Sequence, residues 1–176
     1  MGKFISPGNR LSALFATIRR LPRENTMTIV FDHFLLARVL LTLTTAGWAF
    51  ATILADFNKT HATNPKWTGH ARFHVVWQIN SYIGFGLMAL ALIWCPGSLA
   101  TERLYLAAAM SAITYGGFFV ALLAMPVYGG KVTDTNGYKS FPAPMPLIAK
   151  KWDVNITIFC VQVVILTAGT LAIGWR

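Results

Sequence analysis

The chain has 176 residues, of which 55% are hydrophobic and only 12% are charged. Soluble domains carry about 25% charged residues, so this composition excludes an ordinary soluble globular protein and indicates that lipid is the main solvent. The formal net charge of +9 does not indicate nucleic-acid binding, because nearly all the lysines and arginines lie in the N-terminal segment or between apolar segments. Anionic lipid headgroups attract basic residues at such places, and no nucleic-acid-binding motif is present.

Residues 1–30 form a basic segment that we expect to be separate from the rest of the fold. Its stretch 11–22 (LSALFATIRRLP) combines a mainly apolar run with two adjacent arginines and predicts a short amphipathic helix at the membrane interface. Either Met1 or Met27 fits as the start of the natural protein.

Four apolar segments follow, at residues 31–55, 72–95, 103–126 and 153–175. Each reaches the length of about 20 residues that a helix needs to cross the hydrocarbon core, and separate segments in lipid must be helical. The sequence therefore predicts an all-α protein, a four-helix transmembrane bundle over residues 31–176. An even number of crossings places both termini on one side, and the basic N-terminal segment predicts that this side is cytoplasmic.

Glycines lie in the middle of the second and third predicted helices, at Gly84, Gly86, Gly116 and Gly117. Small residues allow membrane helices to approach closely, so these positions predict tight helix packing.

Residues 56–74, which run from the end of the first helix into the start of the second, hold three of the four histidines. His70 and His74 are four residues apart, so on a helix they share one face, which is a common way to offer two metal ligands. His61 lies in the loop before them, and Asp56 ends the first helix at the same membrane face. We therefore predict a metal site with His61, His70, His74 and Asp56 as ligands, for zinc, iron or copper.

Arg72 lies between the two helical histidines, and we group it with His70 and His74 as candidate catalytic residues. A structural role is equally consistent with the sequence, since histidines and arginines at helix ends often bind headgroups. The fourth histidine, His33, lies at the opposite end of the first helix and is not part of this group.

Two further features favour a functional site at this face. The loop 127–152 must emerge on the same side as the histidine loop, and a loop of that length is often a functional lid. Polar side chains also lie within the helices, where they are costly unless they face the interior. Those that we expect to contact a lipophilic substrate are Gln78, Asn80, Tyr115 and Gln162. Hydrogen bonds between helices would explain the same residues without a ligand.

The motif Thr60-His61, Asn64-Pro65-Lys66-Trp67 and His70-Ala71-Arg72-Phe73-His74, followed by Gln78, resembles a family of uncharacterised four-helix membrane proteins. This resemblance covers about 20 residues closely and implies no activity. A fainter similarity reaches the DoxX-like and anthrone-oxygenase group, which would imply oxidation of a lipophilic aromatic or quinone-like substrate.

Two functions remain open from the sequence. One is an enzyme with oxidoreductase-like chemistry on a lipophilic molecule that enters from the bilayer. The other is a non-catalytic accessory subunit that packs against other membrane proteins in a larger complex.

Overall fold

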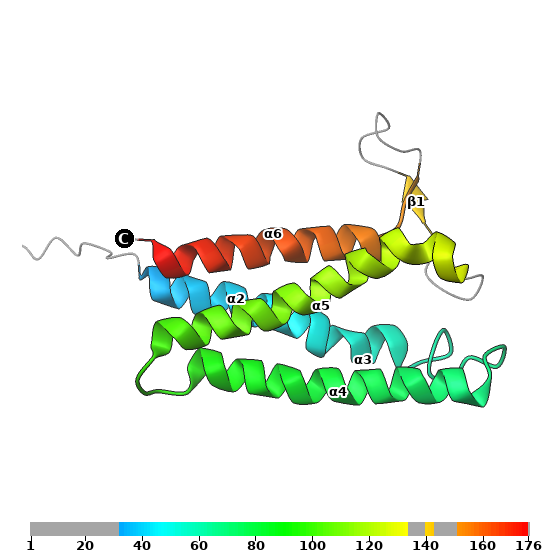
Figure 1. Ribbon diagram of the computed structural model, residues 1–176, viewed down its shortest axis with the longest axis horizontal. Helices are drawn as coiled ribbons and strands as arrows, with labels where there is room; N and C mark the ends of the chain where they lie inside the picture. The colour runs from blue at the N-terminus through cyan, green and yellow to red at the C-terminus, as the bar shows by residue number, and fades with distance from the viewer. Residues whose placement is uncertain (1–31, 134–139, 143–150, 176) are drawn as a thin grey trace, which may run out of the picture. The chain divides into compact units, whose positions relative to one another are not determined.

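The computed structural model describes residues 32–133, 140–142 and 151–175 (Figure 1). The interfacial helix predicted within residues 1–30 and much of the loop 127–152 lie outside these ranges. The elements are α2 (His33–Ala49), α3 (Ala51–Asp56), α4 (Gly69–Trp94), α5 (Ala100–Tyr128), β1 (Phe141–Pro142), β2 (Lys151–Trp152) and α6 (Val154–Gly174). The two short strands pair antiparallel, with Phe141 opposite Trp152.

The predicted four-helix transmembrane fold is confirmed. Four helical spans are long and apolar enough to cross a membrane, and they coincide with the four predicted segments. The largest differences are at the starts of α4 and α5, which begin at residues 69 and 100 rather than at 72 and 103. The Thr68 side chain accepts a hydrogen bond from the Ala71 amide at 3.3 Å, which stabilises the earlier start of α4. The first span is interrupted at Phe50, where α2 ends and α3 begins.

The helices are arranged around a central pair. Helices α2 and α5 contact each other and both of the remaining long helices, and α4 and α6 lie on opposite sides of this pair (Figure 1). The interior is made of small and aliphatic side chains with two large aromatic ones, Trp48 and Tyr115. Most large apolar side chains point outward, as Leu123 and Val127 do with 82% and 90% exposure. A surface of this kind requires lipid, as predicted.

The glycine prediction is confirmed at one position and wrong at three. A Cβ atom at Gly86 would clash with the Cβ of Ala49, so Gly86 permits α4 to pack closely on α2. A Cβ at Gly84, Gly116 or Gly117 would meet no atom of the described residues within 4 Å. At these three positions the helices do not approach each other, and the glycines face open space.

Exposed tryptophans on α4 indicate its depth in the bilayer. Trp77 and Trp94 are 60% and 45% exposed, and at 1.5 Å per residue they are roughly 26 Å apart along the helix. Indole rings prefer the boundary between headgroups and hydrocarbon, and the core is about 30 Å thick. These two residues therefore mark the two faces of the membrane. The first two turns of α4 extend beyond Trp77 into the headgroup region.

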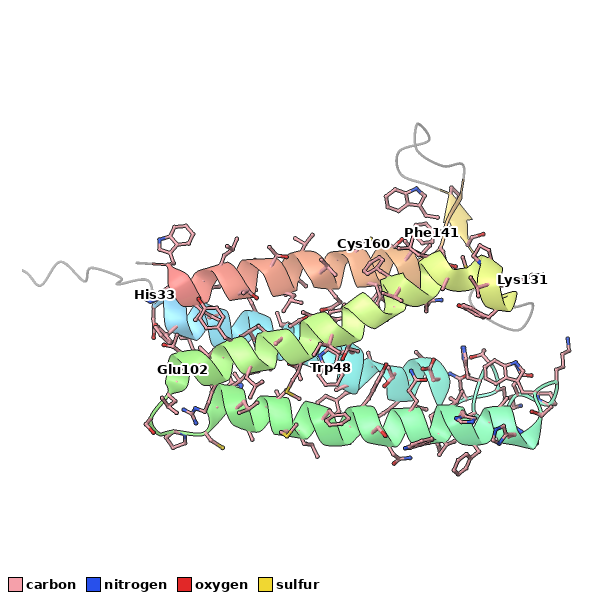
Figure 2. The ribbon with its side chains drawn as sticks, viewed as in Figure 1. His33, Trp48, Glu102, Lys131, Phe141 and Cys160 are labelled. Carbon is pink, nitrogen blue, oxygen red and sulfur yellow. The ribbon has the colours of Figure 1, made fainter. Side chains whose placement is uncertain are left out.

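The bundle has two distinct ends. His33 and Glu102 lie at one end of the helices and Lys131 at the other (Figure 2). The end of α3, the loop that follows it and the start of α4 lie at the second end (Figure 1). The predicted metal-binding and catalytic residues are therefore far from His33, as expected.

Candidate functional site

The loop between α3 and α4 is folded by its own side chains. The Asn58 amide group donates to the carbonyls of Leu54 and Ala55 at 2.8 and 2.9 Å, which closes the end of α3. Asn64 is fully buried; its amide group donates to the Thr60 carbonyl at 2.9 Å, and its oxygen accepts from the Lys66 amide at 3.0 Å. These bonds satisfy backbone groups that have no helical partner, so the loop has a defined path.

This loop orients the ring of His61. The Thr60 hydroxyl lies 2.6 Å from the Asn58 side-chain oxygen and 2.7 Å from Nδ1 of His61. The Asn58 oxygen can only accept, because the amide nitrogen of that side chain donates to α3. Thr60 must then donate its single proton to Asn58, and its oxygen accepts a hydrogen bond from Nδ1 of His61. The network assigns the proton to Nδ1 and leaves the lone pair on Nε2.

Asp56 and Trp67 complete the surroundings of His61. A carboxylate oxygen of Asp56 lies 3.7 Å from Nδ1 of His61, so it supports the protonated nitrogen electrostatically. The Trp67 ring meets the imidazole edge to face, with centroids 5.3 Å apart. A histidine held through one nitrogen by polar partners presents the other nitrogen as a base or a metal ligand.

His70 and His74 form a second pair, on the first turns of α4. Their Nε2 atoms are 3.0 Å apart and their rings are nearly perpendicular, at 86°. Both side chains are exposed, and both lie beyond Trp77 on the headgroup side. The prediction that the i, i+4 spacing brings these two rings together is therefore met in the structure.

The four predicted metal ligands thus form two pairs, Asp56 with His61 and His70 with His74. Within residues 32–133, 140–142 and 151–175, no group of three or more His, Cys, Asp or Glu side chains is close enough to hold one metal ion.

The other predicted site residues lie in two places. Arg72, Gln78 and Asn80 are exposed on α4, and the Asn80 amide donates to the Val76 carbonyl of its own helix at 2.8 Å. Tyr115 is buried on α5 and Gln162 is half-buried on α6, and neither helix carries a histidine. The Tyr115 hydroxyl donates to the Thr44 carbonyl at 2.6 Å, which joins α5 to α2. In the structure, Tyr115 therefore forms a hydrogen bond between two helices.

The Gln162 side chain fills the space above Gly47. A Cβ at Gly47 would lie 2.6 Å from the Gln162 amide nitrogen and 2.9 Å from the Tyr115 hydroxyl, so glycine is required for this approach. The side-chain oxygen of Gln162 is buried, and it has no hydrogen-bond partner in the part of the chain that the structure describes. The buried Thr44 and Thr45 hydroxyls share this property.

A cavity of about 430 Å³ lies between α4 and α5. Trp48 of α2 lies at its base, near the middle of the bundle (Figure 2). The other lining residues come from α4 and α5: Tyr82, Phe85, Met88, Met110, Ile113, Thr114 and Gly117. None of the predicted substrate-binding residues lines this cavity.

The histidine loop and the residues lining the cavity both fall within a match to one family model, over residues 41–152. The chain belongs to the family of unknown function DUF6640. This agrees with the expected membership of an uncharacterised family, and it names no reaction. No curated protein and no solved structure matches the chain. The matched range ends before α6, so the family's shared part consists of the histidine face and helices α4 and α5 with most of the first span.

Two kinds of residue at these sites were not predicted from the sequence: the one that orients His61 and those that line the cavity. Asn58 was not considered as a residue that sets the His61 tautomer, although its position two residues before Thr60 fits an Asx turn. The apolar residues of the cavity were not identified, because aromatic residues and methionines in an apolar helix do not differ in sequence from those that face lipid.

Proposed function

We propose that the protein is an integral membrane protein that binds a transition metal through His70 and His74 at the headgroup level of the membrane. The observation that supports this proposal is the separation of 3.0 Å between the two Nε2 atoms. In this proposal the metal site acts on a lipophilic molecule that arrives from the bilayer.

The geometry of the pair fits two neighbouring positions around one metal ion. Imidazole nitrogens bind zinc at about 2.0–2.1 Å, so two of them are roughly 2.9 Å apart at a right angle and 3.3 Å apart at the tetrahedral angle. The observed 3.0 Å lies in this range. A hydrogen bond from one neutral ring to the other would give the same distance, and it would use the same two nitrogens. Metal binding and this hydrogen bond are therefore mutually exclusive.

Two protein ligands are fewer than the three that catalytic zinc sites usually have, so water or substrate would complete the coordination. Zinc there would supply Lewis-acid chemistry, whereas iron or copper would allow the oxidation that the fainter resemblance implies. His61, held by Thr60 and Asp56 with its lone pair on Nε2, is the candidate proton acceptor at the same membrane face.

The surroundings of the pair suit a lipophilic substrate. Phe73 and Trp77 are 61% and 60% exposed on α4, and their ring centroids lie 6.3 Å apart. The Trp77 ring also lies 5.9 Å from that of His74. Aromatic rings at the boundary between headgroups and hydrocarbon offer an apolar contact next to the two imidazoles.

Elemental analysis of the purified full-length protein tests this proposal. We expect zinc, iron or copper at a constant ratio to protein, and we expect it to be lost in both His70→Ala and His74→Ala. His33→Ala is the matched control, since His33 lies at the opposite end of the bundle, and it should retain the metal.

The proposal would be overturned if the protein contained no metal after growth and dialysis with each of the three ions. Equal metal content in wild type and in both α4 variants would overturn it as well. A metal-free protein that copurifies with a constant membrane partner would instead support the accessory-subunit function.

A further inference from the structure

The cavity between α4 and α5 carries an inference that goes beyond the metal site. We infer that this cavity binds a neutral, ring-containing lipophilic molecule at the middle of the bilayer. Its volume of about 430 Å³ is within the range of small-molecule sites.

The cavity lies at mid-membrane depth. Its α4 residues, Tyr82, Phe85 and Met88, lie about halfway between the interfacial residues Trp77 and Trp94. At 1.5 Å per residue, Phe85 is roughly 12 Å from Trp77 and roughly 16 Å from His74. A molecule in the cavity therefore makes no contact with the histidine pair, and the two sites are independent.

The cavity opens toward lipid. Phe85 and Ile113, which lie on facing helices, are 53% and 75% exposed. Helices α4 and α5 lie closest near their short connection and separate toward the other end of the bundle (Figure 1). A ligand can therefore enter sideways from the hydrocarbon core without crossing the headgroups.

The base of the cavity is rigid and aromatic. The Trp48 indole N–H donates to the Ser111 hydroxyl at 2.9 Å, and this bond is buried. The Tyr82 ring meets Trp48 edge to face, at 90° with centroids 5.8 Å apart. A surface fixed before the ligand arrives costs little conformational entropy on binding. Flat rings make favourable offset or edge contacts with such a surface.

The remaining walls specify the character of the ligand. Met88 and Met110 also line the cavity, and methionine sulfur makes favourable contacts with the aromatic rings of a ligand. Among the residues that the structure describes, no charged side chain lines the cavity, so a charged ligand would be desolvated without a counter-ion. The Tyr82 hydroxyl makes no hydrogen bond to any residue that the structure describes, and it can bond one ligand oxygen.

These features of the cavity favour a ring-containing ligand over a lipid acyl chain. An acyl chain is flexible and has no π system, so it gains little from a fixed pair of aromatic rings and cannot bond to the tyrosine hydroxyl. An acyl chain also finds equivalent contacts in the surrounding bilayer.

The experiment uses full-length protein in nanodiscs and two alcohols with the same numbers of carbon and oxygen atoms. Anthracenemethanol is flat and aromatic, and pentadecanol is a flexible chain. Energy transfer from tryptophan to anthracene reports binding, and pentadecanol is tested as a competitor. We expect saturable binding of anthracenemethanol and no competition by pentadecanol at equal mole fraction in the lipid.

Neighbouring glycines provide matched variants. Gly117 lines the cavity and Gly116 does not, and a Cβ at either one meets nothing within 4 Å. We expect Gly117→Leu to weaken binding about tenfold, equivalent to 1.4 kcal/mol, because its side chain occupies the cavity. Gly116→Leu should bind as wild type does. Tyr82→Phe keeps the ring, and it should weaken the binding of anthracenemethanol more than that of unsubstituted anthracene. This variant tests the inference if Gly117→Leu does not fold.

Equal effects of Gly116→Leu and Gly117→Leu would overturn the inference. Full competition by pentadecanol would assign the cavity to acyl chains and would overturn it too, as would binding that never saturates. His70→Ala should leave anthracenemethanol binding unchanged, so a failure of the metal site and a failure of this inference give different results.

Discussion

The contacts around α2 and the face between α4 and α5 are built from similar residues but pack differently. Around α2, Gly86 lies against Ala49, and a Cβ at Gly169 would be 3.0 Å from the Cβ of Leu40. Between α4 and α5, Gly116 and Gly117 have open space beside them. The difference teaches that glycine in a membrane helix permits close packing without requiring it.

Lipid explains why both kinds of packing coexist. Hydrocarbon outside the bundle is as apolar as the side chains, so no hydrophobic force closes the space between α4 and α5. The helices around α2 are joined instead by small residues and buried hydrogen bonds, Tyr115 to Thr44 and Trp48 to Ser111. The open face is where a ligand can enter at low energetic cost.

The largest effect should come from Gly86→Leu. This change places a side chain where the Ala49 methyl already lies, so α4 must move away from α2. We expect a loss of about 3 kcal/mol in the free energy of unfolding. Gly84→Leu, on the same helix with nothing within 4 Å, should cost little. Denaturant titration in detergent measures both, and equal losses would show that α4 does not pack on α2 as described.

An intermediate effect is expected for Tyr115→Phe. The substitution keeps the buried ring but removes the hydrogen bond of 2.6 Å to the Thr44 carbonyl. We expect a loss of about 1 kcal/mol of unfolding free energy, in the range of interhelical hydrogen bonds in membranes. Tyr105→Phe, at a 44% exposed position, is the control and should be neutral. A neutral Tyr115→Phe would mean that this bond does not hold α5 to α2.

The smallest effect on the free energy of unfolding is expected for glycine-to-alanine changes. Its sign should differ between the contacts around α2 and the face between α4 and α5. Gly117→Ala should stabilise the protein by about 0.5 kcal/mol, because alanine favours the helix and its methyl group enters open space. Gly169→Ala should destabilise it slightly, because the new methyl group would crowd Leu40. Unfolding curves of the two variants, measured under the same conditions, test this prediction. Shifts in the same direction would show that the two regions do not differ in packing.

Hydropathy alone predicted the four crossings, because a helix in lipid must be apolar over its whole length. The pairing of His70 with His74 was equally predictable, since i, i+4 neighbours on a helix meet whatever the tertiary structure. The position of His61 was not, because it depends on a loop whose path is set by the bonds of Asn58 and Asn64. Spacing in sequence could not place that ring relative to α4.

The cavity was not predictable for a different reason. Gly86 and Gly117 both lie mid-helix in apolar surroundings, yet one packs against Ala49 and the other lines a cavity. What separates them is the neighbour that each glycine faces, since Gly86 faces α2 whereas Gly117 faces the space between α4 and α5, and this is a property of the whole bundle. The same holds for Gln162, whose contact with Gly47 requires the packing of α6 on α2.

The two exposed tryptophans of α4 have a consequence for the membrane that suits this protein. Their separation of roughly 26 Å along the helix is shorter than the roughly 32–33 Å of a sterol-rich plasma membrane. Tilting the helix would shorten its span further, so a thick bilayer would have to thin locally around the protein or bury the indole rings. Each ångström of such hydrophobic mismatch around α4 costs a fraction of a kcal/mol.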